Sequence, residues 1–201
     1  MADSKISALS ALGGSSIASG DLLPLVDISD TTMSASGTSK NTTFSDLLTY
    51  LRANGLPQRC VTTSSFNNSS SSTLTDITDA AFSVDAATYW FKFRGKWRTA
   101  ATTTGIGFAF SAPSVSTCSW GVQIRQAAAG TDQYYTNSDT TLTTVLVNAS
   151  AIATATDYDF EIEGHATFSA SGTLQLRFRS EINASQVDVQ TGVIGLLIKI
   201  A

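Results

Sequence analysis

The amino-acid sequence predicts a mainly β protein. We expect an antiparallel β-sandwich of jelly-roll type over residues 57–201, preceded by an extended N-terminal arm, residues 1–56, that contains one short helix. Charged residues make up only 14% of the 201 residues and hydrophobic residues 42%, a composition too apolar for general disorder. Helical periodicity is absent after residue 56, and short apolar segments alternate there with turns rich in Ser and Thr. These features are typical of sandwiches and jelly rolls.

The arm contains a short apolar segment between two loop-forming runs. Residues 13–16 and 34–39 are rich in Gly and Ser, which favour turns and an unpaired chain. Residues 21–28 between these runs are mostly apolar, and Pro24 removes one backbone donor. We therefore expect this segment to be an edge strand or an extended clamp.

A short helix is expected to follow at residues 46–52. Ser45 is placed to cap this helix, Asp46 suits the positive end of the helix dipole, and Asn54-Gly55 ends the helix. About fifty such residues bury too little apolar area to be stable alone, so the arm needs a partner surface. The residues expected to contact that surface are Leu22, Leu23, Leu25, Val26 and Ile28 in the apolar segment, and Leu47, Leu48 and Leu51 on one face of the helix.

The arm also carries an ordered series of short motifs, at Lys5 to Leu9, Ala18 to Asp27, Asp30 to Met33, Ser36 to Lys40 and Phe44 to Leu47. This series resembles the N-terminal segment of bacteriophage virion proteins, especially tail fibres, other appendages and head decorations. The resemblance covers roughly the first quarter of the chain. It implies an attachment module that docks a trimeric protein onto the particle. The alternative is a flexible leader of low complexity.

Residues 57–201 are expected to hold many short strands. Residues 59–62 are a candidate first strand, and the Ser- and Asn-rich run 64–73 is expected to be a loop. Further strands are expected near residues 80–84, 88–99, 105–112, 118–126, 132–136, 141–148, 156–168, 173–181, 186–190 and 192–200. No sequence repeat is present, so neither a propeller nor a β-helix shaft is predicted.

Two of these strands alternate apolar and charged residues, with opposite signs of charge. In the basic strand, residues 89–98, the apolar positions are Tyr89, Phe91, Phe93 and Trp97, and the charged positions are Lys92, Arg94, Lys96 and Arg98. In the acidic strand, residues 157–163, the apolar positions are Tyr158, Phe160 and Ile162, and the charged positions are Asp157, Asp159, Glu161 and Glu163. A period of two places the apolar residues in the core and each set of charges on one exposed face.

These two charge stripes indicate contacts between strands or between subunits. A hairpin is expected to connect the acidic strand to residues 174–179. One register that matches the apolar faces sets Glu163 opposite Arg177 and Glu161 opposite Arg179. The other acidic side chains are then free to meet the basic strand, in the same subunit or in a neighbouring one. Between subunits, complementary stripes would fix the register of assembly.

The last expected strand is apolar on both faces from Val193 as far as Lys199. A strand buried on both sides needs cover from the second sheet or from a neighbouring subunit. Cover by a neighbouring subunit agrees with the trimer that the resemblance implies.

The sequence does not support catalytic chemistry. The carboxylates of the acidic strand are of the type that glycosidases use in pairs, but nothing marks one of them as buried with a raised pKa. An exposed charge ladder is therefore favoured. His165 is the only histidine, and no Ser or Cys lies in a recognisable nucleophile motif. We expect a protein that is not an enzyme.

No metal or cofactor site is expected. Asp76, Asp79 and Asp85 lack the spacing of a calcium loop, and Cys60 and Cys118 fit no metal pattern. We favour buried or free thiols for the two cysteines and leave a disulfide open. The net charge of −4 forms no basic region, which argues against nucleic-acid binding, and no apolar run is long enough to span a membrane.

Together with these observations, the resemblance implies a non-enzymatic virion structural protein, made in the cytoplasm of a host bacterium. It is expected to be a homotrimer whose arm contacts another virion protein of the capsid, portal or tail. In one version it decorates or cements the capsid, because the chain is short and lacks a fibre shaft. In another it is a short tail fibre or adaptor whose β domain binds a host-surface glycan. Exposed clustering of Tyr134 and Tyr135 would favour the second version, and a glycan-acting enzyme is a third, disfavoured version.

Overall fold

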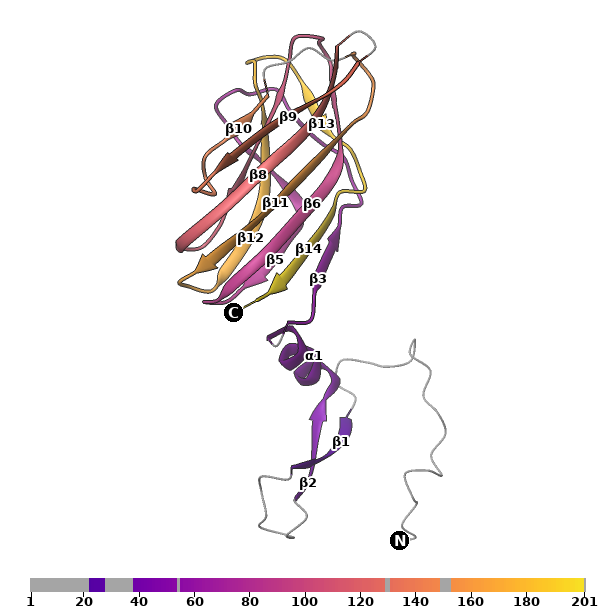
Figure 1. Cartoon of the computed structure of the whole chain (residues 1–201). Helices are drawn as coiled ribbons and strands as arrows, with labels where there is room; N and C mark the ends of the chain where they lie inside the picture. Colours follow the sequence, from indigo (N-terminus) through magenta and orange to yellow (C-terminus); the bar gives the residue numbers. More distant parts are fainter. Residues whose placement is uncertain (1–21, 28–37, 54, 129–130, 149–152, 201) are drawn as a thin grey trace. The chain divides into compact units, whose positions relative to one another are not determined.

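The computed structural model describes residues 22–27, 38–53, 55–128, 131–148 and 153–200 (Figure 1). The chain divides into two compact units, Met1–Asn54 and Gly55–Ala201. We call them the N-terminal unit and the sandwich unit.

The N-terminal unit contains a two-stranded antiparallel sheet followed by a helix. Strands β1 (Leu22–Asp27) and β2 (Thr38–Thr43) pair with Pro24 opposite Asn41. The apolar segment thus forms a strand at a sheet edge, as expected, whereas β2 begins in a run predicted to be unpaired. Helix α1 (Phe44–Ala53) follows β2 directly.

The cap of this helix differs from the predicted one. Thr43 Oγ1 accepts a hydrogen bond from the backbone N of Asp46 at 3.0 Å, and the Asp46 carboxylate accepts one from the backbone N of Thr43 at 3.4 Å. These reciprocal contacts are those of a capping box. The prediction of Ser45 as the cap was wrong, because the helix starts earlier and places Ser45 inside its first turn.

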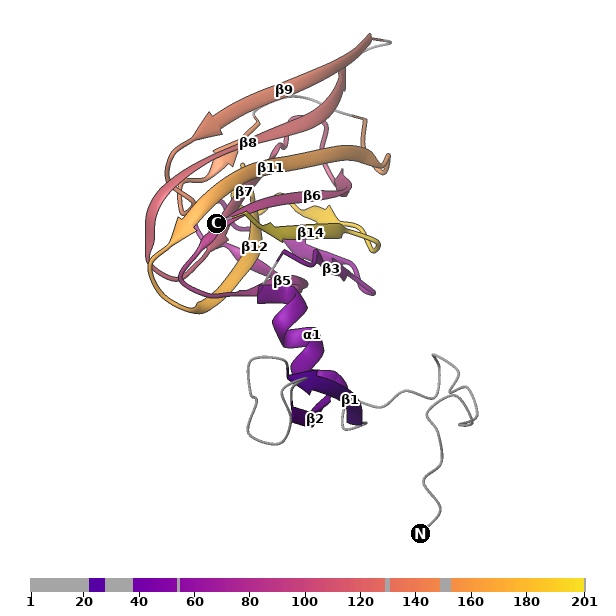
Figure 2. The same ribbon diagram turned by 60° about the horizontal axis from the view of Figure 1, so that its bottom comes forward.

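The sandwich unit consists of two antiparallel sheets, which confirms the predicted mainly β fold (Figure 2). The larger sheet has eight strands. Six of them lie in the order β3 (Gln58–Val61), β14 (Ile194–Lys199), β6 (Thr88–Thr99), β11 (Tyr158–Phe168), β8 (Val115–Ala128) and β9 (Thr131–Asp139). The other two are β13 (Val187–Val189), which pairs with β6, and β4 (Phe66–Asn68), which pairs with β13. The smaller sheet has the order β10 (Leu146–Val147), β7 (Ile106–Ser111), β12 (Gly172–Ser180) and β5 (Thr75–Val84).

Aromatic side chains from both sheets form the core. The apolar positions of the basic and acidic strands are buried, as the period of two predicted: Tyr89, Phe91, Phe93, Trp97, Tyr158, Phe160 and Ile162. Phe110 of the smaller sheet packs edge-on against Phe91 and Trp120 of the larger sheet, with ring centroids 5.1 Å apart in both pairs. The core therefore fixes which face of each strand is exposed.

Three expectations for the strands were wrong. The run 64–73 contains β4, and of residues 141–148 only Leu146–Val147 form a strand. The acidic strand, β11, and residues 174–179, in β12, do not pair, because the connection between them crosses from one sheet to the other. The apolar residues of β11 and of β12 both point into the core, as predicted. They face each other across the core, however, because the two strands lie in different sheets.

Candidate ligand-binding groove

The basic and acidic strands are direct neighbours in the larger sheet. β6 and β11 pair antiparallel, with Arg94 opposite Glu161 and Lys96 opposite Asp159. The ion pairs that cross these strands are Lys92 Nζ to Glu161 Oε1 at 2.6 Å, Lys92 Nζ to Glu163 Oε2 at 3.1 Å, Arg94 Nε to Glu161 Oε2 at 2.9 Å, and Arg98 Nη2 to Asp157 Oδ1 at 2.7 Å. The two stripes therefore neutralise each other within one chain.

This pairing shifts two protonation equilibria. The hydrogen bonds that Glu163 accepts from Lys92 and from Trp90 Nε1 lower the pKa of its carboxyl group. The hydrogen bond to Glu161 raises the pKa of Lys92. Both shifts favour the charged forms, so these residues form a charge ladder and are not poised to transfer protons near neutral pH.

β13 and β14 follow the same edge of β6 but are separated by a bulge at residues 190–193. The register against β6 ends at Val189 and resumes at Ile194, two residues out of step. Gly192 in this bulge has a φ of +87°, a conformation that favours glycine. Bulges of this kind redirect side chains and often lie next to functional sites.

Thr62 holds the bulge in place. Its backbone N donates to Val193 O at 2.9 Å, and its carbonyl O accepts from Gly192 N at 3.0 Å. Its Oγ1 accepts from Val193 N at 2.9 Å, and Thr191 Oγ1 donates to its carbonyl O at 3.4 Å. Thr62 is only 2% exposed, and its hydrogen bond from Val193 N is buried, so Thr62 anchors the bulge to the core side of the sheet.

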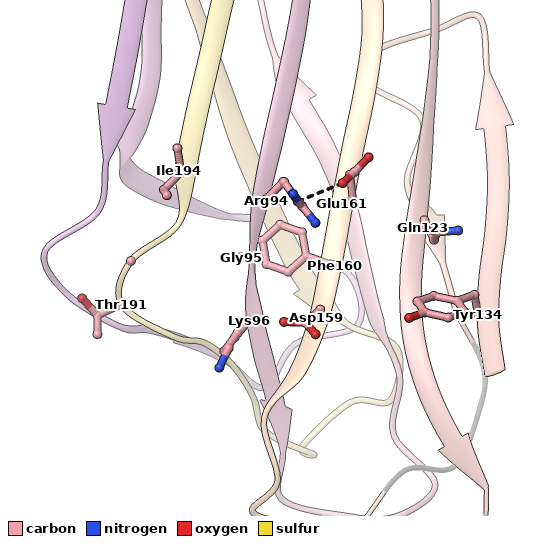
Figure 3. Close-up of a pocket in the computed structure, with 11 residues that line it drawn as sticks. Arg94, Gly95, Lys96, Gln123, Tyr134, Asp159, Phe160, Glu161, Thr191 and Ile194 are labelled. Atoms are coloured by element: carbon pink, nitrogen blue, oxygen red, sulfur yellow. Dashed lines mark ion pairs between the residues drawn. The ribbon is translucent and has the colours of Figure 1, made fainter. Parts of the chain in front are cut away.

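The bulge forms one wall of a groove of about 550 Å³ on the outer face of the larger sheet. In Figure 3, Thr191 and Ile194 lie on one side of this groove, and Gln123 and Tyr134 lie on the other. The charged lining residues between these sides are Arg94, Lys96, Asp159 and Glu161.

Three polar side chains of the groove have no side-chain hydrogen bond or ion pair with any residue that the structure describes: Lys96, Gln123 and Tyr134. Tyr134 is 54% exposed. The side chain of Arg94 is 72% exposed, although its Nε is paired with Glu161. The groove therefore presents hydrogen-bonding groups that are free to meet a ligand.

A second, smaller hollow of about 320 Å³ adjoins the groove. It shares Gln123 and Glu161 with the groove and extends along β8 and β9 to Gly121 and Thr136. The absence of a side chain at Gly121 leaves this hollow open. The two hollows thus share part of their lining.

Tyr134 and Tyr135 do not form one exposed cluster. They are neighbours in β9, so their side chains lie on opposite faces of the sheet. Tyr134 faces outward into the groove, whereas Tyr135 packs against the core, and its hydroxyl accepts a hydrogen bond from Asn137 Nδ2. Sequence reasoning missed Gln123, whose only signal was its polar position between the apolar residues Val122 and Ile124.

The predicted pairings of Arg177 and Arg179 with the acidic strand were wrong. Arg177 Nε lies 2.6 Å from Asp76 Oδ1, and Arg179 Nη1 donates to the backbone O of Ser71. Both arginines belong to the smaller sheet, so they cannot reach β11.

Strand β14 is open on one face in the single chain. Its inner face, with Leu197, packs into the core, as cover by the second sheet predicted. On the outer face, Ile194 is 46% exposed, and Val61, its partner on β3, is exposed as well. Val61 and Ile194 form a small apolar strip beside the groove.

The residues predicted to dock the arm lie on β1 and α1. Leu22, Leu25 and Val26 belong to β1, and Ile28 lies outside the described residues. The side chains of Leu23, Leu47 and Leu48 are half-buried, and Leu51 is 40% exposed. The helix therefore keeps part of its apolar face accessible.

No group of three or more His, Cys, Asp or Glu side chains is placed to hold a metal ion within the described part of the chain. His165 pairs with Trp90 on one side and Ser119 on the other. Cys60 and Cys118 are free thiols, and burial raises the pKa of both. None of the helices among the described residues has the length and apolar character needed to cross a membrane.

Comparison with known proteins found no matching family model and no matching curated protein. Several solved structures resemble the fold. Eiger TNF from S. frugiperda has a TM-score of 0.34 and 9% identity, over 73% of this chain and 93% of that one. A family 16 carbohydrate binding module has a TM-score of 0.17 and 12% identity, over 65% and 74% of the two chains. The VP2 protein of infectious bursal disease virus has a TM-score of 0.18 and 11% identity, over 72% and 40%. Likeness at this level has no bearing on function.

Proposed function

We propose that this protein is a non-enzymatic structural protein of a bacteriophage virion, a homotrimer that decorates or cements the particle. The arm, residues 1–56, attaches it to another virion protein of the capsid, portal or tail, and the sandwich unit faces outward. The observation that carries the proposal is the ordered series of arm motifs that resembles phage attachment segments, part of which falls on β1, β2 and α1.

The N-terminal unit supports a role in docking. Helix α1 has Leu51 40% exposed, and Leu47 and Leu48 lie on the same face of the helix. An accessible apolar face on a small unit needs a partner surface, and another virion protein supplies it.

The outer face of β14 supports self-association. Val61 and Ile194 are exposed side by side there, and adjacent exposed apolar side chains are typical of interaction surfaces. Burial of this strip against a second copy would cover the open face of the strand.

The test is to locate the protein on purified virions with gold-labelled antibody against the sandwich unit. We expect labelling of the particle, and a chain with Leu47→Asp and Leu51→Asp should fail to bind particles that lack the protein. The matched control Thr49→Asp, on another face of the helix, should bind. Absence of the protein from purified virions would contradict the proposal.

Light scattering tests the oligomeric state. We expect trimers for the full chain and for a fragment that starts at Leu56. A monomeric fragment would show that the arm itself drives assembly.

A second candidate function is a short tail fibre or adaptor that binds a host-surface glycan. The groove with Tyr134 and Gln123 favours it, because it offers free polar groups beside an exposed aromatic ring. Labelling at the tail instead of the head would distinguish this function from capsid decoration.

A further inference from the structure

We propose that the groove on the larger sheet binds a neutral oligosaccharide that lies across the strands. This inference deepens the proposed function and rests on it only in that the sandwich unit must be displayed on the particle. It assigns to the sandwich unit a class of ligand, a binding site on the larger sheet and the residues that contact the ligand.

The shape of the groove suits a chain of sugar rings. Its lining runs from Ile194 in β14 across β6, β11 and β8 to Tyr134 in β9. Four steps between adjacent strands make it roughly 19 Å long, since neighbouring strands lie about 4.8 Å apart. A length of this size accommodates several linked monosaccharides, and the volume is within the range of ligand sites.

The groove is formed before any ligand arrives. One wall is the bulge, which Thr62 fixes through four hydrogen bonds. The floor consists of central strands whose inner faces are packed into the aromatic core. Binding therefore orders few groups, which lowers its entropic cost.

The free polar groups match those of a sugar. Each sugar hydroxyl both donates and accepts hydrogen bonds. The Lys96 ammonium group donates, and the Gln123 amide and the Tyr134 hydroxyl can do both. An apolar ligand would bury these groups without partners, at a cost in free energy.

The charge of the groove favours a neutral ligand. Arg94 and Lys96 are balanced by Asp159 and Glu161, so the lining offers no net field to a phosphate, a sulfate or a nucleic acid. The exposed ring of Tyr134 supplies a flat apolar surface, on which the C–H face of a pyranose ring can stack.

The experiment uses the full chain on a printed array of neutral oligosaccharides built from hexoses and N-acetylhexosamines, with sialylated and sulfated counterparts. Binding to the best probe is then measured by calorimetry for the wild type and for Tyr134→Ala and Gln123→Ala. We expect a neutral probe to bind and each variant to weaken binding about tenfold. Tyr50→Ala is the matched control, since Tyr50 is an exposed tyrosine of the N-terminal unit.

Unchanged thermal unfolding of the two groove variants shows that they fold. The proposal is overturned if no neutral probe binds, if only charged probes bind, or if both groove variants bind as tightly as the wild type. If antibody finds the protein on virions but the protein binds no sugar, only this inference is rejected. Absence from virions, with sugar binding intact, rejects only the proposed function.

Discussion

Lys92 Nζ lies 2.6 Å from Glu161 Oε1, across two strands that are far apart in the sequence but adjacent in the larger sheet. The same ammonium group reaches Glu163, and Glu161 also binds Arg94. Lys92 and Glu161 thus each have two charged partners. Networks of this kind hold strand register better than isolated surface pairs.

Lys92→Gln tests the ladder, with Lys96→Gln as its matched control. Both lysines lie on the outer face of β6, but Lys96 has no ion pair with the described residues. We expect Lys92→Gln to lower the free energy of unfolding by about 1 kcal/mol and Lys96→Gln by less than about 0.5 kcal/mol. Urea unfolding at low salt measures both, and high salt should reduce the difference. Equal effects of the two substitutions would contradict the ladder.

The stability of the sandwich should depend on pH through the same residues. The pKa of Glu163 is lowered on folding, so its contribution is present above the ordinary value of 4.5 and is lost as the pH falls through the folded value. The pKa of Lys92 is raised, so its contribution is present below the ordinary value of 10.5 and is lost above the folded value.

We therefore expect a plateau of the urea midpoint from about pH 4.5 to the ordinary thiol value of 9.0, with losses in acid and in alkali. The buried thiols act in the same direction as Lys92, because their raised pKa favours the protonated form in the folded chain. Glu163→Gln should reduce the loss of stability between neutral pH and acid. An identical acid limb in this variant would show that Glu163 does not contribute.

The alternation of residues predicted burial well but not the partners of each strand. A period of two assigns Phe91 and Phe160 to the core whatever lies beside them, because side chains alternate across any strand. Pairing depends on how the chain crosses between sheets, and nothing in residues 157–179 records that β12 joins the other sheet. The register of Glu163 with Arg177 was wrong for this reason.

The groove could not be predicted because no single stretch of sequence contains it. Its lining comes from five strands and one bulge. The local sequence signal was Thr191-Gly192 between two apolar segments. It indicates an interruption of the strand, but it does not predict the two-residue register shift against β6 that forms one wall of the groove. Strand β4, Phe66–Asn68 within the Ser- and Asn-rich run, was missed because its strand character comes from pairing with β13 and not from its own residues.

The two buried tryptophans of the larger sheet differ in their hydrogen bonds. Trp120 Nε1 donates to the backbone O of Thr141 at 3.1 Å, whereas Trp97 Nε1 is buried without a partner among the described residues. Substitution by Phe removes a similar volume at each position. It removes a satisfied donor at Trp120 and an unsatisfied one at Trp97.

We expect Trp120→Phe to lower the free energy of unfolding by about 1–2 kcal/mol more than Trp97→Phe does. Urea unfolding followed by far-ultraviolet circular dichroism measures both without relying on tryptophan fluorescence. A larger loss for Trp97→Phe would mean that packing, and not hydrogen bonding, separates the two sites.

Close packing at Gly164 gives the last prediction. A Cβ added to Gly164 would lie 2.5 Å from Trp120 Cβ and 2.7 Å from the backbone O of Ser119, atoms that cannot move without shifting β8. We expect Gly164→Ala to lower the free energy of unfolding by about 2–3 kcal/mol. Gly121→Ala is the matched control on β8: its Cβ would lie 3.0 Å from Asn137 O, on the open outer face, and should cost less than about 1 kcal/mol. Because neither glycine has a positive φ, the comparison measures space and not backbone strain, and thermal unfolding of the two variants decides it. Equal losses would show that β8 and β11 can separate at Gly164 to admit a methyl group, and that the core there is less rigid than the packing implies.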